Sequence, residues 1–377
     1  TLTLTPNRLL RSVKVGGTAA TQTLRLQNTG GGVLTFAVTS NVPWMTVSPS
    51  SGSSDGTAAR NLQVSYASAS LATGTYNGTI TITSAEAQNS PVTVSVRLRV
   101  VPDRYVINDF DGDGSSDLGV YFAPGGNWYV FRSSLGFYQD QFGFAGTVPV
   151  AGDFDGDGKS DLAVYYPPGG NWYIFGSQRG FFVDQFGFVG TIPVTGDYDG
   201  DGKTDLALYY PPSGTWYIFR SQLGFYSEVF GAPDTLPVSG DFDGDGRSDL
   251  AYYFPPGGNW MIKGSSRGVF SETFGYAGTV PISGDFDGDG TSDLAVYYAP
   301  GGNWYIFGSR RGFFQDQFGY AGTIPVPGDF DADGRSDLAV YYPPGGNWYI
   351  FRSSEGFLSD QFGFLGTVPL GSTITAP

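Results

Sequence analysis

The sequence of 377 residues contains no cysteine and no histidine. Disulfide bonds, thiolate nucleophiles, imidazole general bases and zinc sites of the usual cysteine and histidine type are therefore excluded. No run of 18 apolar residues is present, so we predict no insertion into a membrane. No signal peptide is visible and the first residue is Thr1 instead of Met, so we interpret the sequence as a mature or excised segment.

Glycine, proline and aromatic residues are abundant. The counts are 58 Gly, 24 Pro, 24 Tyr and 30 Phe, and no segment has the pattern of a long helix. Such a composition is typical of short strands joined by tight turns. We predict an all-β protein of more than one domain.

An acidic motif of ten residues recurs six times. Its second copy runs from Asp153 to Leu162 with the sequence DFDGDGKSDL, and carboxylates occupy positions 1, 3, 5 and 9. Residues 103–370 therefore form one array of repeats. Successive copies begin 44 residues apart, without insertion or deletion, at Asp109, Asp153, Asp197, Asp241, Asp285 and Asp329.

The spacing of the motif indicates a site for a hard cation. Side chains at odd positions of a tight loop can face one ion, and glycine at position 6 permits the reversal that returns position 9 to it. An EF-hand is excluded because position 12 holds Val, Leu or Tyr instead of a bidentate Glu. We predict about six Ca²⁺ ions per chain. The ligands of each would be four aspartates and the backbone carbonyl of position 7, from Asp109, Asp111, Asp113, Ser115 and Asp117; Asp153, Asp155, Asp157, Lys159 and Asp161; Asp197, Asp199, Asp201, Lys203 and Asp205; Asp241, Asp243, Asp245, Arg247 and Asp249; Asp285, Asp287, Asp289, Thr291 and Asp293; and Asp329, Asp331, Asp333, Arg335 and Asp337.

Asp-Gly turns without a metal are the alternative interpretation. Such turns would hold four carboxylates within a few ångströms of one another with no cation to offset the repulsion. In the sixth copy Ala332 replaces the glycine of position 4. Because this side chain need only point outward, we expect no loss of metal binding there.

The formal net charge of −15 is largely explained by these loops, which hold 24 aspartates. Six calcium ions would return twelve positive charges and leave about −3. The remaining balance gives no support for a nucleic-acid partner. Calcium loops of this kind fill where free calcium is near millimolar, so we predict a secreted protein that is extracellular or at the cell surface.

Residues 1–102 lack the repeat and form a separate predicted domain. The spacing of their strands and polar turns is typical of an immunoglobulin-like β-sandwich. Alternation of apolar and polar residues predicts strands at Gln22 to Gln27, Leu34 to Val38, Leu62 to Tyr66, Tyr76 to Thr83 and Val92 to Val101.

Two segments of this domain, VPWMTVSPSSG from Val42 and GTYNGTITI from Gly74, resemble the BACON family of bacterial immunoglobulin-like domains. The resemblance implies a carbohydrate-related role or a spacer role, and we favour the spacer. Trp44 is either a sugar-stacking platform or a core residue, and core packing is favoured.

Each repeat contains four predicted strands, which is the size of one blade of a β-propeller. Radial closure leaves no exposed sheet edges, so the array predicts a six-bladed β-propeller over residues 103–370. All six metal loops would lie on one of its faces. For the second copy the predicted strands are Leu162 to Tyr166, Asn171 to Gly176, Phe181 to Gly187 and, leading into the next loop, Thr191 to Tyr198.

The DxDxDGxxDL loops, each followed by an apolar strand, resemble the FG-GAP or VCBS repeats of bacterial surface proteins, which are related to those of integrin α-subunits. The resemblance implies structural calcium that stiffens blade hairpins, with binding carried out by other loops and by blade edges. The chain departs from the integrin pattern in its shorter units and in having six copies instead of seven.

Two segments compete for the innermost strand of the first blade. Arg104 to Phe110 precedes the first acidic loop, whereas Thr367 to Leu370 copies the same strand at the end of the array with no loop after it. The terminal segment either closes the ring or adds as a strand to a neighbouring molecule, and internal closure is favoured. Residues 371–377 are a predicted tail.

The repeats differ most at the third and fourth copies. There Gly231-Ala232-Pro233-Asp234 replaces the usual loop, and Lys263 replaces a phenylalanine. Two explanations are open: sequence drift, which is favoured, or a groove between these repeats in which Lys263 offers a cation to a ligand.

Phe181-Phe182 and Phe313-Phe314 are predicted to approach the rim of the propeller. One tryptophan per repeat is either a sugar platform or inter-blade packing, with packing favoured, at Trp128, Trp172, Trp216, Trp260, Trp304 and Trp348.

Three function classes remain. We predict a non-catalytic binding or adhesion module for a glycan or a surface protein, as the FG-GAP resemblance and the aromatic residues imply. The first alternative is a structural subunit of a surface filament, sheath or matrix, which self-associates through the C-terminal strand. The second is a polysaccharide-active enzyme that uses carboxylates alone, although the acids outside the loops also recur once per repeat, at Asp140, Asp184, Glu228, Glu272, Asp316 and Asp360.

Overall fold

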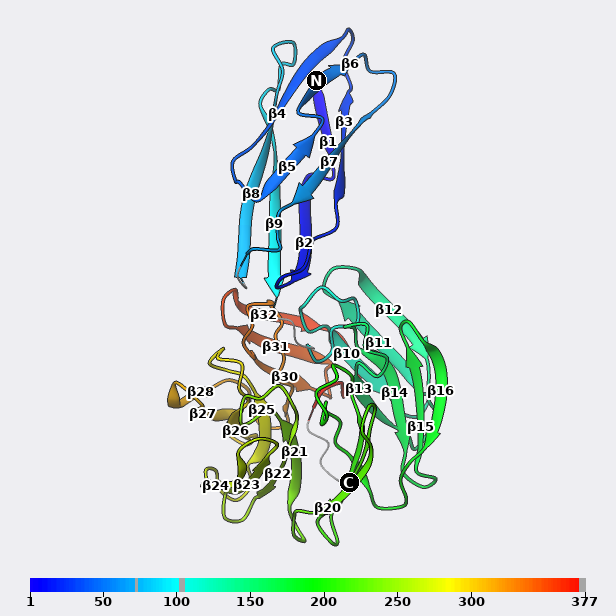
Figure 1. Cartoon of the computed structure of the whole chain (residues 1–377), viewed down its shortest axis with the longest axis vertical. Coiled ribbons are helices and arrows are strands. Elements are labelled where there is room, and N and C mark those ends of the chain that lie inside the picture. Colours follow the sequence, from blue (N-terminus) through cyan, green and yellow to red (C-terminus); the bar gives the residue numbers. More distant parts are fainter. Residues whose placement is uncertain (72–73, 102–105, 373–377) are drawn as a thin grey trace. The chain divides into compact units, whose positions relative to one another are not determined.

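The computed structural model of the protein describes residues 1–71, 74–101 and 106–372. All secondary-structure elements within these ranges are β-strands, which confirms the all-β class. The chain divides into two compact units, Thr1–Asp103 and Arg104–Pro377 (Figure 1). Across the described ranges, no helix has the length and hydropathy needed to cross a membrane.

The first unit consists of two sheets. All neighbouring strands pair antiparallel except β2 and β9, which are parallel. One sheet has the order β1 (Leu2–Thr5), β3 (Gln22–Asn28), β7 (Arg60–Tyr66), β5 (Met45–Ser48). The other has the order β2 (Arg8–Lys14), β9 (Val92–Val101), β8 (Gly74–Thr83), β4 (Leu34–Ser40), β6 (Ser51–Ser54).

A single hydrophobic core joins the two sheets of the first unit. Alternate residues of β3 and β7, such as Leu24 and Leu62, are fully buried beside Ile80 of β8. Trp44 belongs to this core, with 8% of its surface exposed and its ring stacked on Tyr66. The prediction of core packing for Trp44 is confirmed. All five strands expected in this region are present, whereas the sequence analysis missed β1, β2, β5 and β6.

Residues 106–372 of the second unit form six four-stranded antiparallel sheets that follow one another along the chain (Figure 1). The first sheet contains β12 (Gly136–Gln141), β11 (Asn127–Arg132), β10 (Leu118–Phe122) and β33 (Val368–Pro369). The second contains β13 (Val148–Gly152), β14 (Asp161–Tyr166), β15 (Asn171–Gly176) and β16 (Gly180–Gln185). The third contains β17 (Ile192–Pro193), β18 (Leu206–Tyr210), β19 (Thr215–Arg220) and β20 (Gly224–Val229).

The remaining sheets repeat the same order. The fourth contains β21 (Leu236–Gly240), β22 (Asp249–Phe254), β23 (Asn259–Gly264) and β24 (Gly268–Thr273). The fifth contains β25 (Val280–Gly284), β26 (Asp293–Tyr298), β27 (Asn303–Gly308) and β28 (Gly312–Gln317). The sixth contains β29 (Ile324–Pro325), β30 (Leu338–Tyr342), β31 (Asn347–Arg352) and β32 (Gly356–Gln361).

The strand prediction for the repeat is close to this arrangement. In the second repeat, β14, β15 and β16 each start and end within two residues of the expected bounds. The expected strand from Thr191 to Tyr198 is shorter, because only β17 and an isolated bridge between Gly196 and Asp205 are formed. In the second to sixth sheets an acidic loop joins the first two strands, as it does β13 and β14. The first acidic loop instead precedes β10, whose partner on that side is β33.

Each sheet shares a hydrophobic core with the next one in the chain. Trp172 and Ile174 of the second sheet pack with Leu208 of the third. The sixth sheet shares its core with the first in the same way, since Trp348 lies in one cluster with Val120. The sheets therefore follow a cyclic order, and the repeated sheets form a propeller-like repeat fold.

The tryptophans of the six repeats are packing residues. They are 0–1% exposed, and each indole N–H donates to a backbone carbonyl, as Trp172 does to Phe186 at 2.9 Å. A buried indole with its donor satisfied cannot present a face to a sugar, so packing is confirmed for these residues.

The terminal strand β33 pairs with β10 of its own chain. The N–H of Leu370 donates to the Gly119 carbonyl, and the Leu370 side chain is 2% exposed. The Asn108 side-chain amide donates to the Leu370 carbonyl at 3.1 Å. Of the two alternatives, closure within the chain and addition to a neighbouring molecule, the structure has the first. Of the competing segment, residues 104–105 lie outside the described ranges and residues 106–110 form no strand.

Candidate metal centre

The carboxylate at position 1 of each acidic loop is held by backbone N–H groups. In the second loop, Asp153 Oδ1 accepts from the N–H groups of Gly156 and Asp157 at 2.6 and 3.1 Å. Its Oδ2 accepts from Gly158, at position 6, at 2.7 Å. Gly158 has a φ of 87°, in the left-handed region that favours glycine, as the sequence predicts for this position.

The carboxylates at positions 5 and 9 connect the loop to the outer hairpin of its own sheet. Asp161 Oδ2 accepts from the N–H of Phe154, and its Oδ1 accepts from the N–H of Ser177 at 2.7 Å. Asp157 accepts from the N–H of Lys159 and from the Ser177 hydroxyl. These contacts fix both carboxylates in place.

Only one of the two oxygens of the carboxylate at position 3 accepts hydrogen bonds. Asp155 Oδ2 accepts from the N–H groups of Gln178 and Arg179, both at 2.8 Å. Its Oδ1 is buried and has no hydrogen-bond partner within the described part of the chain. A buried carboxylate oxygen without a partner is costly, so it calls for a ligand. The same atom is orphaned in all six loops, at Asp111, Asp155, Asp199, Asp243, Asp287 and Asp331.

Three carboxylates converge within each of at least five loops. In each named group, one carboxylate oxygen from every member lies within 4.8 Å of the others. These groups are Asp109, Asp111 and Asp117; Asp153, Asp155 and Asp161; Asp197, Asp199 and Asp205; Asp241, Asp243 and Asp245; and Asp285, Asp287 and Asp289.

Burial makes these charges unfavourable without a counterion. Desolvation raises the pKa of Asp161 to about 7, and the Asp155 carboxylate nearby adds to the shift. Burial likewise raises the pKa of Asp117 and of Asp337 to about 8. A bound cation would offset both the desolvation and the repulsion.

The donor set fits a hard cation. It offers only oxygen atoms from fixed carboxylates, and the position-3 carboxylate of each loop has one buried oxygen without a hydrogen-bond partner. Hard divalent cations such as Ca²⁺ prefer such oxygen sets, whereas the thiolates and imidazoles that softer metals prefer are absent from the chain. The clusters of aspartates could therefore hold metal ions. The position-7 carbonyls as ligands stay a prediction.

Neighbouring loops are joined in a closed ring by backbone hydrogen bonds of 2.6–2.7 Å. The N–H at position 8 of one loop donates to the carbonyl of position 1 of the preceding loop. The last of these bonds joins the first loop to the sixth, across 213 residues. The pairs are Ser160 to Asp109, Thr204 to Asp153, Ser248 to Asp197, Ser292 to Asp241, Ser336 to Asp285 and Ser116 to Asp329.

Position 4 of each loop faces the neighbouring loop. A Cβ atom added to Gly156 would lie 2.9 Å from the Lys203 side chain, which occupies position 7 of the next loop. Ala332 of the sixth loop is only 3% exposed and has a φ of 54°. Position 4 is thus covered by the adjacent loop, and the expectation that the sixth loop keeps its metal binding stays a prediction. Its cyclic neighbour at position 7, Ser115, is the smallest residue at that position.

Two sets of supporting residues were missed by the sequence analysis. The position-8 serine or threonine closes the ring, and Ser177 with its equivalents holds positions 5 and 9. Both recur every 44 residues, the first at position 8 of the acidic motif and the second outside it, so this recurrence is the signal that could have found them. The equivalents of Ser177 are Ser133, Ser221, Ser265, Ser309 and Ser353.

The irregular boundary between the third and fourth sheets contains an ion pair. Lys263 Nζ donates to the Glu228 carboxylate, which also accepts from the Tyr226 hydroxyl. Lys263 is therefore already paired within the chain, and the prediction of a cation offered to a ligand is not supported. The sheets on either side are linked by this pair where the other boundaries have phenylalanine.

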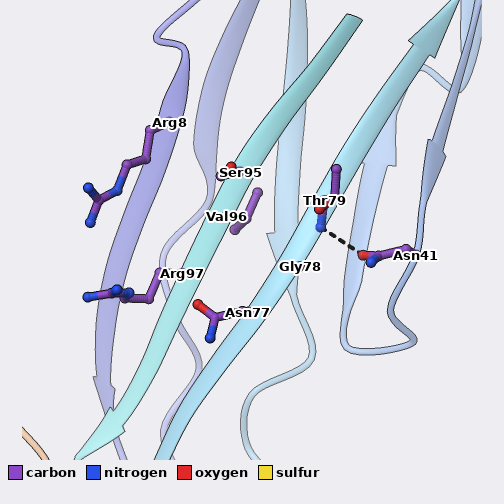
Figure 2. A pocket seen from close by; sticks show the side chains of 8 residues that line it. All are labelled: Arg8, Asn41, Asn77, Gly78, Thr79, Ser95, Val96 and Arg97. Atoms are coloured by element: carbon purple, nitrogen blue, oxygen red, sulfur yellow. Dashed lines mark hydrogen bonds between the residues drawn. The ribbon is translucent and has the colours of Figure 1, made fainter. Parts of the chain in front are cut away.

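A polar hollow lies on the five-stranded sheet of the first unit (Figure 2). Arg8 and Arg97 extend on the same side of neighbouring strands β2 and β9, close to Asn77 of β8. The N–H of Thr79 donates to the Asn41 side chain at 2.7 Å. The hollow contains no acidic residue in its lining and does not resemble the metal loops.

Two family descriptions match parts of the chain. Residues 1–97 match the family described as "Viral BACON domain". Residues 153–208 and 197–252 match the family described as "FG-GAP-like repeat". The chain therefore carries a BACON-like domain at its N-terminus followed by FG-GAP-like repeats, as the sequence analysis expects. No curated protein sequence matches the chain.

Solved structures give weak similarities. A lectin of Agrocybe aegerita that recognises non-reducing terminal N-acetylglucosamine aligns at 16% identity and a TM-score of 0.45, over 69% of this chain and 77% of that one. A streptogramin B lyase aligns at 8% identity and a TM-score of 0.46, over 69% and 87%. A Bacteroides ovatus xyloglucanase aligns at 13% identity and 0.21, over 33% of this chain and 22% of that one. Similarities this weak identify neither a ligand nor a reaction for this chain.

Proposed function

We propose that residues 103–370 form a six-bladed β-propeller and that residues 1–102 form an immunoglobulin-like β-sandwich. The cyclic order of shared cores and the closed ring of loop hydrogen bonds support the propeller. The two sheets around one core support the sandwich.

In this proposal each acidic loop holds one Ca²⁺ through its carboxylates at positions 1, 3, 5 and 9 and the carbonyl of position 7. The observation that carries this assignment is the buried, unpartnered Oδ1 of position 3, which recurs in all six loops. When bound, the ion would neutralise the clustered carboxylates and tie the loop to the outer hairpin. Its role is structural.

The function that we propose is a non-catalytic, extracellular binding module for glycans or surface proteins. The six loops repeat one pattern of contacts, so none of them stands out as a specialised site. Catalysis needs one pocket that differs from the rest and contains groups with perturbed pKa values. The acids outside the loops also recur on the outer strands, as Asp184 and Asp316 do. Repetition of this kind suits many weak contacts with a multivalent partner.

An extracellular location follows from the same assignment. Weak calcium sites fill at the near-millimolar free calcium found outside cells and stay empty at cytosolic levels. A filament subunit is the second candidate, but the strand that would join its subunits pairs with β10 of its own chain. The binding module is therefore preferred.

A glycan array tests the proposed function. The calcium-loaded chain should bind at least one class of glycan, and binding should be lost in EDTA because the loops support the binding surfaces. The array is read with fluorescently labelled protein in calcium and in EDTA. Turnover of a polysaccharide that is abolished by Glu272→Gln would contradict the non-catalytic assignment.

A further inference from the structure

A short motif carries one aromatic ring at five of the six boundaries between sheets. The motif is Phe-Gly-Phe/Tyr-x-Gly-Thr, and its third residue is 40–42% exposed. At the boundary between the third and fourth sheets the sequence is instead Phe-Gly-Ala-Pro-Asp-Thr, and Ala232 stands in place of the ring. We call these five exposed rings the platform rings: Phe144, Phe188, Tyr276, Tyr320 and Phe364.

The turn that carries each platform ring is held rigidly. In the fifth-sheet example, the Thr323 hydroxyl donates to the Tyr320 carbonyl at 2.7 Å and contacts the buried Tyr297 hydroxyl at 2.5 Å. The threonine is 4% exposed. A ring that is fixed before a ligand arrives loses little conformational entropy on binding.

Two further rings of the next sheet support each platform ring. Around Tyr320 these are Tyr342 and Tyr349, with ring centroids 5.1 and 5.9 Å away. Both contacts are tilted or edge-on, at 53° and 69°, so neither neighbour is stacked flat against the platform ring. The two supporting rings are tyrosines in four of the five triads, whereas Phe122 and Tyr129 support Phe364. No charged residue belongs to a triad.

The chemistry of the triad fits one pyranose ring of a neutral glycan. A sugar has an apolar C–H face, which suits an aromatic ring, and a rim of hydroxyls, which can bond to the tyrosine hydroxyls. A protein partner would need about 800 Å² of continuous surface on this side, whereas the platform rings are distributed one at each of five boundaries between sheets. We propose, on the basis of the binding module proposed above, that the five platform rings are equivalent stacking sites for the sugars of a neutral polysaccharide.

The number of sites matters for affinity. One stacked sugar binds weakly, but a polymer that contacts several platform rings converts later contacts into intramolecular ones. The irregular boundary is the exception, because Ala232 offers no ring and Tyr252 instead packs on Phe230 at 5.3 Å. The chain therefore has five stacking sites and six acidic loops.

Retention on insoluble polysaccharides tests this inference with the full calcium-loaded chain. The probes are microcrystalline cellulose, chitin, mannan and granular starch. A double variant, Tyr276→Ala with Tyr320→Ala, should weaken retention at least about tenfold on the probe that the parent protein binds, since two of five sites are lost. The matched control is Phe313→Ala with Phe357→Ala, two rings 56% and 59% exposed elsewhere on the fifth and sixth sheets; it should bind like the parent.

The conservative variant Tyr276→Phe with Tyr320→Phe keeps the rings and should retain most of the binding, which separates stacking from misfolding. If the parent binds a probe and the alanine variant binds it equally well, the platform assignment is wrong while the binding module stands. If the parent binds no probe and no glycan on an array, the proposed glycan function itself fails. A further outcome is that the parent protein binds no glycan but binds phosphatidylcholine vesicles, with that binding lost in the alanine variant. This result would assign the rings to a lipid surface and overturn the inference.

Discussion

Removal of calcium should lower the melting temperature of the second unit by more than about 20 °C and leave the first unit within about 2 °C of its value. A ligand that binds only the folded form contributes about 2.7 kcal/mol per site at a hundredfold excess over its Kd, so six sites contribute about 16 kcal/mol. Without the ion, each loop keeps a buried, unpartnered Oδ1 beside other carboxylates. The first unit has no acidic loop of this kind in its sequence.

Calorimetry of the full chain in calcium and in EDTA measures both transitions at once. Adding back excess calcium after EDTA should restore the original curve, which serves as the control for damage by the chelator. A melting curve that is the same in EDTA and in calcium would mean that the acidic loops are turns without a metal.

Deletion of the terminal strand should also lower the melting temperature by a large amount. A chain that ends at Gly366 should melt about 10 °C lower or more, because about 2–5 kcal/mol is lost with the buried Leu370 side chain alone. The deletion also removes the pairing of β33 with β10 and the contact of Thr367 with the Tyr341 hydroxyl. The first sheet would then have an open edge at β10.

The matched control is deletion of residues 371–377, which keeps β33 and Leu370 and should melt like the parent. Circular dichroism gives the melting temperatures, and sedimentation gives the state of association. If the chain ending at Gly366 melts like the parent but no longer self-associates, β33 serves as a connector between molecules and the internal pairing is not its main role.

Much of the loop was predictable because its chemistry is local. The odd spacing of the carboxylates and the glycine at position 6 are sequence features, and the φ of 87° at Gly158 bears out the second. The middle strands of the repeat were predictable for the same reason, since an apolar run between turn residues leaves little choice. In the first unit, alternation sufficed for β3 and β7, where Leu24 and Leu62 face the core.

Contacts between repeats were not predictable. The hydrogen bond from Ser116 to the Asp329 carbonyl joins residues 213 positions apart, and nothing in either local sequence specifies the other. The burial of Ala332 depends on the loop that lies beside it, and Lys263 is paired because Glu228 of the preceding sheet reaches it. The local sequence around Ala332 would be the same if its side chain were exposed, and the local sequence around Lys263 would be the same if its ammonium group were unpaired.

The terminal strand is an intermediate case. The sequence identifies two segments for one place, and choosing between them requires knowing which one pairs with β10. The structure gives that place to β33. The side chain of Leu370, the residue after β33, lies against Gly119, where a Cβ atom would be 2.5 Å from Leu370 Cδ1. Glycine at that point of β10 leaves the space that the leucine fills.

The most direct test of the account is a count of calcium ions in the folded chain. Native mass spectrometry, or anomalous scattering from crystals grown in calcium, gives the number per molecule. Six acidic loops with the same orphaned oxygen predict six ions per chain, and Asp155→Ala should reduce the count to five while the control Asp184→Ala leaves it at six. Two or fewer ions in the calcium-saturated parent protein would contradict the assignment of the loops as metal sites.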